Sequence, residues 1–517
     1  MKLREAFART VRCYPEQPAV VTDDGRTVTY AELDERSTRL ANALQQRVGD
    51  RRCAVLAHNG LPAVESMLAG NKRGVGTVQL SYRATVTELD DMVATASPRA
   101  LVFDDANADT ALALLDRRDF EAAIHAGDRT VDNELVESYG AVLDDAPATL
   151  DPALPVGDEC GVLYTSGTTS TPKAVPFDQE QLWYGAVQVI MEHGIDETDT
   201  ALCTTLWYHM LTTDAWLYPH FVAGATVVLH SSFDLREALE LIEGHDVTGL
   251  LAVPTQLKAI NGVQQDAGFD VDTLEYIRTG GSVVSESLVA RTSELLTDQV
   301  YNTYGMTEAG PDLTFAHPSA QADHPGTIGK ESFSWEIRVV ETATLDEDPD
   351  PEATVEAGER GEIIARGPGM STGYIDNPQA ESKTYFDGWL RTRDVATVDE
   401  DGYLYIVDRV DNMIVSGGEN VYPAEVEDAI ADHPRVADAV VVPVADEQWG
   451  QVGKAVVEPA ETVETDDEPL TLAELRDFLD GRLARFKHPR HLAFVDELPT
   501  SGPSKIDRDA VEAEFGE

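Results

Sequence analysis

The sequence predicts an α/β protein with a large N-terminal domain of layered α/β subdomains, a small β subdomain and a small α+β C-terminal domain. Three observations predict this fold class. The chain of 517 residues is too long for one ordinary core. Helical patterns alternate with short apolar runs as far as about residue 320, and short strands with tight turns follow. A third pattern, which mixes helices and strands, begins after Asp411.

The N-terminal pattern is that of strands alternating with helices. Residues 30–47 (YAELDERSTRLANALQQR) predict a helix, whereas CAVLAHN at 53–59 and RALVFDD at 99–105 predict strands. The same alternation continues at 225–231, 238–254 and 274–281. Such alternation favours a layered body with largely parallel strands.

The β subdomain is predicted at about residues 320–408. Strands are expected at 335–341 and 361–367. The DEDG turn within VATVDEDGYLYIVD (395–408) predicts a hairpin. An N-terminal domain is therefore predicted over residues 1–410.

The C-terminal domain is predicted over residues 411–517. Pro423 suits the first position of a helix, and acidic residues follow in the first turn. Two strands and a further helix are expected at 437–444, 453–460 and 472–484. The acidic stretch 461–469 between them is expected to be a solvated loop.

The net charge is strongly negative. Asp and Glu number 93 against 39 Lys and Arg, so the formal charge is −54 at pH 7. The acidic residues are spread along a chain that is 42% apolar, which favours a folded protein with an acidic, hydrated surface over a disordered tail. Salt screens such a surface, so we predict a halophilic source. Binding to nucleic acid is disfavoured because phosphates would be repelled.

No targeting or membrane segment is predicted. The opening MKLREAFARTVRCYPEQ lacks an apolar core of the signal-peptide kind, and no apolar run is long enough to span a bilayer. The cysteines Cys13, Cys53, Cys160 and Cys203 have no paired spacing. We therefore expect four reduced core thiols in a cytoplasmic enzyme, with neither disulfides nor a zinc site.

A loop rich in hydroxyl residues is the most informative segment. In residues 161–173 (GVLYTSGTTSTPK) an apolar strand leads into a loop with one glycine and a terminal lysine, Lys173. Its hydroxyl residues are Thr165, Ser166, Thr168, Thr169, Ser170 and Thr171. Hydroxyls and backbone N–H groups suit phosphate oxygens, and lysine adds a positive charge. The loop is not a Walker A motif, because Pro172 and Ala174 flank the lysine.

This loop resembles the signature of the adenylate-forming superfamily, which contains acyl-CoA synthetases, carrier-protein adenylation domains and firefly-type luciferases. Ser170 and Ala174 replace glycines of that signature, which we expect to stiffen the loop. The resemblance implies that Lys173 is catalytic. It assigns ATP binding in this loop to Thr165, Ser166, Gly167, Thr168 and Thr169.

Residues 301–310 (YNTYGMTEAG) resemble the family's second core motif. The resemblance implies that Tyr304 stacks on adenine, that Thr307 contacts the α-phosphate and that Glu308 holds Mg²⁺. Thr279-Gly280-Gly281-Ser282 resembles a turn that lies against adenine and the acyl group. By resemblance, ATP binding is assigned to Asn302, Thr303, Tyr304, Gly305 and Gly281, and the acyl pocket to Gly280 and Met306.

Two further segments resemble the ribose-binding and hinge positions of the family. GWLRTRD (388–394) matches a Trp-x-x-Thr-Gly-Asp motif, with Arg393 in the glycine position. The resemblance implies that Asp394 and Arg409 contact the ribose. It also places Asp411 at the hinge about which a mobile C-terminal domain turns, although the sequence without the resemblance favours a simple linker acid.

The C-terminal motifs concern the thiol and the last lysine. Residues 416–425 (SGGENVYPAE) resemble the segment that lines the thiol's tunnel, so Ser416, Gly417 and Gly418 are assigned to CoA. LPTSGPSKIDR (498–508) resembles the C-terminal Gly-Lys motif, with Ser504 replacing the glycine. The resemblance makes Lys505 the catalytic lysine of the first half-reaction.

The acyl group is less well specified. In TLWYHMLTTDAWLYPHFVAGA (205–225), His209 occupies a position that gates the acyl pocket in many acyl-CoA ligases, although a satisfied core histidine is equally expected. Amino-acid-activating relatives carry Phe-Asp where this chain has Met210 and Leu211, so an amino-acid substrate is disfavoured. Thr212 replaces a frequent glycine and is expected to narrow the pocket.

The resemblance implies an ATP-dependent ligase that forms an acyl-adenylate, releases pyrophosphate and transfers the acyl group to CoA. Residues 416–425 are most similar to those of aryl- and fatty-acyl-CoA ligases. Two alternatives stay open: an enzyme that loads a carrier protein, and a non-catalytic acyl or nucleotide sensor. Many relatives are homodimers, but the sequence shows no interface.

Overall fold

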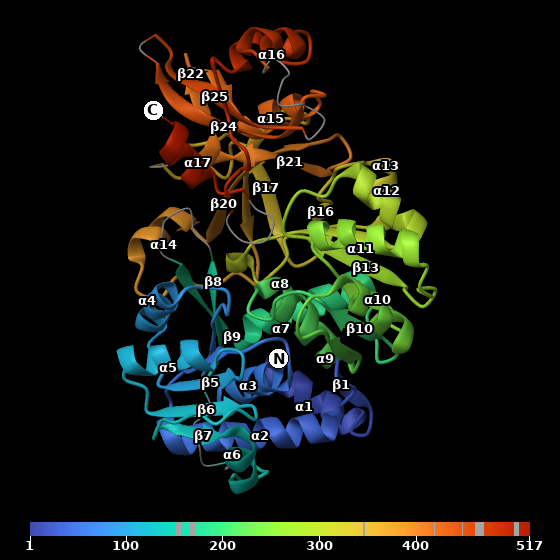
Figure 1. Ribbon diagram of the computed structural model, residues 1–517, viewed down its shortest axis with the longest axis vertical. Coiled ribbons are helices and arrows are strands. Elements are labelled where there is room, and N and C mark those ends of the chain that lie inside the picture. Colours follow the sequence, from blue (N-terminus) through green and yellow to red (C-terminus); the bar gives the residue numbers. More distant parts are fainter. Residues whose placement is uncertain are drawn as a thin grey trace. The chain divides into compact units, whose positions relative to one another are not determined.

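The structure is a computed structural model that describes residues 1–150, 152, 157–165, 172–344, 347–417, 419–446, 448–460, 470–500 and 506–516. These residues form two compact units (Figure 1). The first unit comprises Met1–Ile337 and Ala365–Leu390, and the second comprises Arg338–Ile364 and Arg391–Glu517.

One sheet of the first unit has the strand order β7-β6-β5-β3-β4-β8-β9. Neighbouring strands are parallel except β8 and β9, which are antiparallel. All four residues of β3 are buried, as is typical of an inner strand in a parallel sheet. The strands are β3 (Cys53–Leu56), β4 (Thr77–Gln79), β5 (Ala100–Asp104), β6 (Ala122–Ala126), β7 (Val136–Ser138), β8 (Glu159–Thr165) and β9 (Lys173–Asp178).

The other sheet of this unit has the order β16-β15-β14-β13-β12-β10-β11-β1-β2. The pairs from β14 through β13, β12, β10 and β11 to β1 are parallel, whereas β14–β15, β15–β16 and β1–β2 are antiparallel. The predicted layered body with largely parallel strands is therefore confirmed. The strands are β1 (Pro18–Thr22), β2 (Thr27–Thr29), β10 (Thr200–Cys203), β11 (Thr226–Leu229), β12 (Gly249–Leu251), β13 (Tyr276–Gly280), β14 (Val300–Tyr304), β15 (Thr314–Ala316) and β16 (Lys330–Glu331).

Helices connect these strands, and capping side chains fix where several of them begin. The Thr29 hydroxyl accepts a hydrogen bond from the backbone N–H of Glu32, whose carboxylate accepts one from the backbone N–H of Thr29. The helices are α1 (Leu3–Cys13), α2 (Tyr30–Val48), α3 (Leu61–Arg73), α4 (Val86–Ala96), α5 (Ala108–Arg117), α6 (Tyr139–Asp145), α7 (Gln179–His193), α8 (Met210–Thr212), the π-helical turn η1 (Thr213–Leu217), α9 (Tyr218–Ala223), α10 (Leu235–Gly244), α11 (Pro254–Ala267), α12 (Glu286–Leu295), the 3₁₀ turn η2 (Thr307–Ala309), α13 (Pro318–Asp323) and α14 (Pro378–Thr384).

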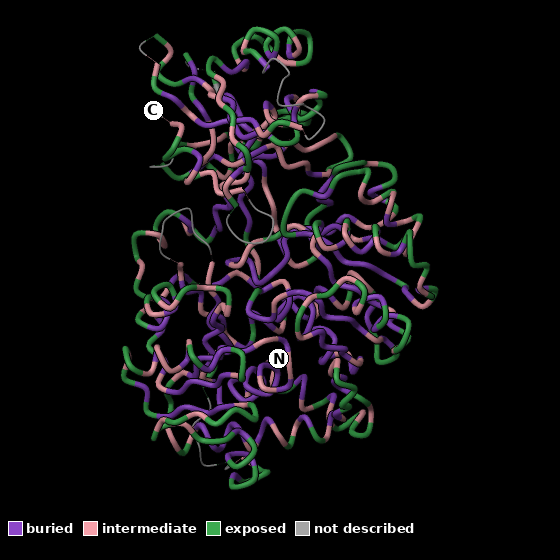
Figure 2. Tube along the Cα trace, viewed as in Figure 1, coloured by how far each residue is buried: buried purple, intermediate pink, exposed green. Residues whose placement is uncertain are grey.

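Buried residues, purple in Figure 2, run along the strands and the inner faces of the helices. The amphipathic helix α1 shows the principle, because it buries Leu3 and Phe7 and exposes its polar face. Phe7 meets the rings of Tyr30 and Phe221, with centroid distances of 6.2 and 6.4 Å. Helix α1 is thereby fixed against α2 and α9.

In the second unit, β20 pairs antiparallel with β21, and Val398 faces Leu404 across the turn. The hairpin predicted at DEDG is therefore confirmed. The buried Arg391 guanidinium donates to both oxygens of Glu362, at 2.7 and 2.9 Å, and this ion pair joins β20 to β18. The strands of this region are β17 (Glu336–Val340), β18 (Arg360–Arg366), β19 (Tyr385–Phe386, in the first unit), β20 (Trp389–Val398) and β21 (Leu404–Arg409).

A second sheet of this unit has the order β23-β22-β25-β24, with β26 on β25. Pro423 begins a helix as predicted, but the helix expected at 472–484 ends at Leu479, because Gly481 turns the chain with φ +82°. The acidic stretch 461–469 lies outside the described residues. The elements are η3 (Val410–Asn412), β22 (Ile414–Ser416), β23 (Glu419–Val421), α15 (Pro423–Ala431), β24 (Val436–Asp446), β25 (Gly450–Pro459), α16 (Leu472–Leu479), η4 (Arg485–Lys487), β26 (His491–Phe494) and α17 (Arg508–Phe515).

All four cysteines are free, but the prediction that all are core thiols is wrong for Cys13. Cys13 lies at the exposed end of α1, whereas Cys53, Cys160 and Cys203 are buried. Burial raises the pKa of the Cys53 and Cys203 thiols to about 12, so these two thiols are unreactive at neutral pH. Among the described residues, no helix combines the length and apolar character needed to cross a bilayer.

Candidate active site

The predicted phosphate loop joins two antiparallel strands. Thr165 ends β8 and Lys173 begins β9, and the two residues face each other in the strand register. Lys173 is therefore followed by a strand, whereas a Walker A lysine opens a helix. The predicted ATP contacts Ser166, Gly167, Thr168 and Thr169 lie outside the described residues.

Lys173 and Glu308 are brought together by a tyrosine. The Lys173 ammonium lies 5.3 Å from the centroid of the Tyr374 ring, within reach of a cation–π interaction. The Tyr374 hydroxyl donates a hydrogen bond to Glu308 Oε1 at 2.5 Å. Burial, and after it the Glu308 charge, raises the pKa of Tyr374, so the hydroxyl keeps its proton and holds the carboxylate.

Glu308 is buried, and residues 371–374 contact both its backbone and its side chain. The Ser371 N–H donates to the backbone carbonyl of Glu308 at 2.8 Å, and the Ser371 hydroxyl hydrogen-bonds the Tyr385 hydroxyl. Because the single Tyr374 proton goes to Glu308, the Thr384 hydroxyl, 3.3 Å from the Tyr374 oxygen, is the donor in that pair. Sequence reasoning missed this segment; the glycines of GPGMSTGY (367–374) indicate a turn, but not its contact with Glu308.

Glycines shape the carboxyl ends of β13 and β14. Gly280 and Thr303 are paired, and a Cβ at Gly280 would lie 2.3 Å from the carbonyl oxygen of Thr303. A Cβ at Gly305 would lie 2.0 Å from the carbonyl oxygen of Pro311. Gly281 adopts φ +80°. Only glycine fits at these positions, so the predicted turns have a steric cause.

The remaining residues of this motif differ in their freedom to contact a ligand. The Asn302 amide is buried and donates to the carbonyl oxygen of Thr327 at 3.1 Å. Tyr304 and Met306 are half-buried and pack against an apolar cluster that contains Trp335. Thr307 is half-buried at the start of η2.

A buried ion pair beneath this motif was also missed. Arg278, on β13, donates to both oxygens of Asp312 at 2.6 Å, and neither side chain is more than 4% exposed. The backbone carbonyl of Asp312 accepts a hydrogen bond from Gln188 at 2.8 Å. The pair holds residues 311–312 against β13. It thereby fixes the carbonyl group of Pro311, which lies against Gly305.

The predicted acyl segment 205–225 forms α8, η1 and α9. His209 precedes α8, and its side chain is exposed. The surrounding protein, and then Arg83, lowers the pKa of His209 to about 4, so the ring is neutral at pH 7. An exposed ring does not suit a satisfied core histidine.

Asp214 in η1 is a fully buried carboxyl group. Neither of its oxygens has a hydrogen-bonding partner among the described residues, and burial raises its pKa well above the usual value. The folded protein therefore keeps a proton that the unfolded chain loses above pH 4, and stability falls as pH rises beyond that point. We expect Asp214→Asn to stabilise the protein at pH 7 by roughly 1–3 kcal/mol, measured by thermal unfolding.

The matched control is Asp199→Asn. Asp199 is also buried, but its oxygens accept hydrogen bonds from Thr248 and from the backbone of Asp196. An amide would place its NH₂ against one of these donors, so no stabilisation is expected. If Asp214→Asn gains as much stability at pH 4 as at pH 7, the explanation based on a buried, titrating carboxyl is wrong.

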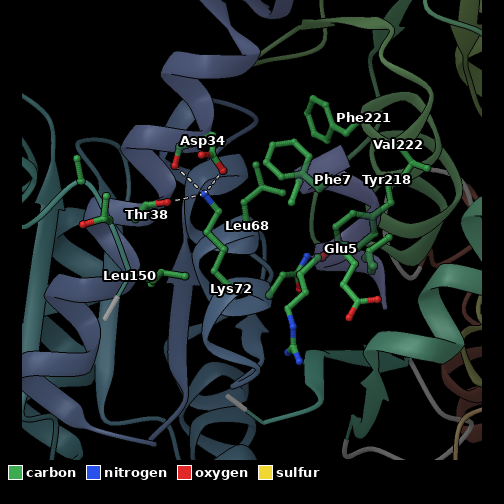
Figure 3. Close-up of a pocket in the computed structure, with 16 residues that line it drawn as sticks. Glu5, Phe7, Asp34, Thr38, Leu68, Lys72, Leu150, Tyr218, Phe221 and Val222 are labelled. Carbon is green, nitrogen blue, oxygen red and sulfur yellow. Dashed lines mark hydrogen bonds and ion pairs between the residues drawn. The ribbon is translucent and has the colours of Figure 1, made fainter. Parts of the chain in front are cut away.

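A cavity of about 440 Å³ lies among α1, α2, α3 and α9 (Figure 3). Phe7, Leu68 and Phe221 contribute to its apolar wall. At its polar end the Lys72 ammonium donates to the backbone and side-chain oxygens of Asp34 and to Thr38, at 2.6 to 2.7 Å. None of the predicted site residues that the structure describes lines this cavity, and these include all the predicted acyl-pocket residues, so it is not the predicted acyl pocket.

In the second unit, the predicted ribose and hinge residues form one ion-pair network. Arg409 lies opposite Asp394 in the β20–β21 register and donates to it at 2.7 Å. Asp411, in η3, accepts from Arg409 at 3.1 Å and from Arg393 at 2.7 Å. Arg393 adopts φ +62°, which costs a residue other than glycine roughly 1–2 kcal/mol.

The predicted CoA segment ends β22. Ser416 is buried, and Gly417, with φ +63°, packs against the Trp449 ring, where a Cβ would come within 2.4 Å. Glycine is thus required at 417. Gly418 and Lys505 lie outside the described residues.

Two family models match this chain. The AMP-binding enzyme model covers residues 7–375, and the AMP-binding enzyme C-terminal domain model covers residues 425–505. The chain belongs to the family of AMP-binding enzymes. The chain is 36% identical over 513 residues to a feruloyl-CoA synthase from Amycolatopsis sp, and 98% of each chain is covered. It is 31% identical to an indoleacetate–CoA ligase from Aromatoleum aromaticum, with 99% and 98% covered.

A solved structure agrees with this membership. The o-succinylbenzoate CoA synthetase from Bacillus subtilis, in complex with its acyl-adenylate intermediate, is 28% identical, with a TM-score of 0.81 and 98% and 97% of the two chains covered. The predicted family and fold class, a large N-terminal and a small C-terminal domain, are confirmed. The predicted enzyme class, an AMP-forming ligase, is also confirmed.

Proposed function

We propose that this enzyme activates an aromatic carboxylic acid with ATP and transfers the acyl group to CoA. The observation that carries the proposal is the group formed by Lys173, Tyr374 and Glu308, which places an ammonium and a buried carboxylate around one tyrosine. The relatives named above act on feruloyl, indoleacetate and succinylbenzoate groups, and all three are aromatic. A carrier-protein loader and a sensor are not favoured by these relatives.

In the first half-reaction, a carboxylate oxygen of the acid attacks the α-phosphorus of ATP, and the bond to pyrophosphate breaks. The protein's part is positioning and neutralisation of charge. Lys173 and the hydroxyl residues of the loop are proposed to hold the β- and γ-phosphates, and Thr307 to contact the α-phosphate. Lys505 is proposed to bridge the carboxylate and the α-phosphate.

The residues at Glu308 fit a magnesium ion that is held mainly by the nucleotide. Glu308 supplies one carboxylate whose Oε1 is fixed by Tyr374. The part of the chain that the structure describes has no cluster of three or more His, Cys, Asp or Glu for a metal, and Mg²⁺ typically takes one or two carboxylates and completes its shell with phosphates and water. When bound, Mg²⁺ neutralises part of the triphosphate charge.

In the second half-reaction, the CoA thiol attacks the acyl carbon, AMP leaves and the thiol proton passes to solvent. We propose that the C-terminal domain, residues 411–517, turns about Asp411 between the two steps. Asp411 lies between the segments that the two family models match, which supports this boundary. Residues 416–418 are proposed to line the thiol's path, and a neutral His209 is proposed to gate the acyl pocket.

A panel of acids tests the proposed substrate class. We expect acyl-CoA formation with hydroxycinnamic, indole-acetic or benzoic acids to exceed that with saturated fatty acids of similar size at least tenfold in kcat/KM. Formation of AMP that is independent of CoA would instead favour a carrier-protein acceptor. Equal rates with fatty acids would contradict the aromatic assignment.

From the net charge of −54 we propose a halophilic source, so the assay is run at low and at high salt. We expect activity and thermal stability to increase with salt, since screening reduces repulsion between surface carboxylates. We further propose that the enzyme uses Mg²⁺, forms a homodimer and acts in the cytoplasm.

A further inference from the structure

The ion-pair network around Asp411 contains a residue that the family motif does not supply. Arg393 stands where the resembling motif has glycine, and it keeps the backbone conformation that favours glycine, with φ +62°. A large side chain in this conformation is strained, so it persists where its contacts compensate for the strain.

The contact that compensates is made to the predicted hinge residue. Arg393 Nη1 donates to Asp411 Oδ1 at 2.7 Å, and the two side chains are only 18% and 15% exposed. Pairs shielded to this degree are screened less by salt than surface pairs. The other oxygen of Asp411 accepts from Arg409, so both carboxylate oxygens are engaged by guanidinium groups.

The network continues to the predicted ribose contact. Arg409 donates one hydrogen bond from Nη2 to Asp411 Oδ2 at 3.1 Å and another from Nη1 to Asp394 Oδ1 at 2.7 Å. Arg393, Asp411, Arg409 and Asp394 thus form a chain of alternating charges with no net charge. Because β20 and β21 fix Asp394 and Arg409 in register, Asp411 is held to the sheet by two arginines.

We propose that Arg393 is a positioning residue that ties the hinge carboxylate of Asp411 to the ribose-binding pair Asp394–Arg409. A turn of the chain at Asp411 breaks the Arg393 contact, so this contact biases the balance between the two hinge conformations. The inference rests on the proposed function for its kinetic consequence, but the contact itself can be tested without catalysis.

The first test is trypsin cleavage after Arg409 in the full-length protein, followed by mass spectrometry. Arg393→Asn removes the guanidinium, while asparagine tolerates the left-handed conformation. We expect cleavage to be about tenfold faster, because the loss of one charge-assisted hydrogen bond makes local opening of the chain at Arg409 easier by about that factor. In an Asp411→Asn background the same substitution is expected to change cleavage less than twofold. Arg485→Asn, which removes a guanidinium that is 84% exposed, is the matched control and should have no effect.

The second test separates positioning from a merely structural role. In Arg393→Asn, the ratio of the rate of acid-dependent pyrophosphate release to the rate of acyl-CoA formation from supplied acyl-adenylate is expected to change at least about fivefold. Arg393→Lys, which keeps a positive charge, is expected to restore part of the ratio.

Three results would overturn the proposal. Unchanged cleavage in Arg393→Asn would show that the contact does not hold the hinge, and an equal effect in the Asp411→Asn background would show that Asp411 is not its target. Faster cleavage with an unchanged ratio of the two half-reaction rates would show that Arg393 only stabilises the fold and does not affect the hinge equilibrium. If the wild-type enzyme shows no acid-dependent pyrophosphate release, the proposed function fails, and the cleavage comparison still decides the Arg393–Asp411 contact.

Discussion

Glu308→Gln is expected to lower acid-dependent pyrophosphate release by roughly 100- to 1000-fold. The substitution keeps the shape of the side chain, and the amide oxygen can still accept the hydrogen bond that Tyr374 donates at 2.5 Å. What is lost is the negative charge proposed to hold Mg²⁺ beside the triphosphate. We therefore expect the defect to lessen as the Mg²⁺ concentration is raised, measured by a pyrophosphate-release assay over a range of Mg²⁺.

Tyr374→Phe tests the hydrogen bond from Tyr374 to Glu308 separately from the charge of the Glu308 carboxylate. This variant keeps the ring that faces Lys173 and removes only the hydroxyl. Because one hydrogen bond to a charged group is lost, we expect the rate of acid-dependent pyrophosphate release to fall about tenfold, which is less than in Glu308→Gln. A Glu308→Gln enzyme within twofold of wild type at every Mg²⁺ concentration, with an unchanged melting temperature, would exclude the proposed role of Glu308.

Lys505→Met is expected to slow adenylation roughly 1000-fold and to leave thioester formation from supplied acyl-adenylate within about threefold of wild type. The lysine is proposed to counter charge only while the carboxylate attacks the α-phosphate. The second half-reaction begins from a finished acyl-adenylate and does not need it. Single-turnover assays of the two half-reactions, performed on the same preparation, measure the split.

The control for this split is Lys258→Met on α11. Lys258 is exposed, and replacing it by methionine removes one positive charge from the surface of the first unit. Both half-reactions are expected to be unaffected in this variant. Equal losses in both half-reactions of Lys505→Met would contradict a role confined to adenylation, and no loss in either would remove Lys505 from the site.

Local patterns predicted most of the fold. The hairpin at DEDG, the helix that begins at Pro423 and the alternating strands and helices depend on turn residues and periodicity within short segments. The glycines at 280 and 305 were also predictable, because they belong to recognisable turns. The end of α16 at Leu479 was misjudged, since the apolar pattern continues past a glycine that stops the helix.

The contacts that support the site could not be predicted in the same way. Tyr374 lies 66 residues after Glu308, and nothing in its local sequence indicates that the two meet. Arg278 and Asp312 form a buried pair, although a charged residue within a strand is ordinarily expected to face solvent. Arg393 was noticed as a departure from glycine, but only the folded chain shows that its side chain reaches Asp411.

The central claim is that a carboxylate oxygen attacks the α-phosphate of ATP before CoA reacts. The most direct test is to supply an aromatic acid labelled with ¹⁸O in both carboxyl oxygens, together with ATP, Mg²⁺ and CoA, and to analyse the products by mass spectrometry. The mechanism predicts acyl-CoA with one ¹⁸O and AMP with one ¹⁸O per turnover, with none in pyrophosphate. Label in inorganic phosphate together with ADP, or AMP without label, would contradict it.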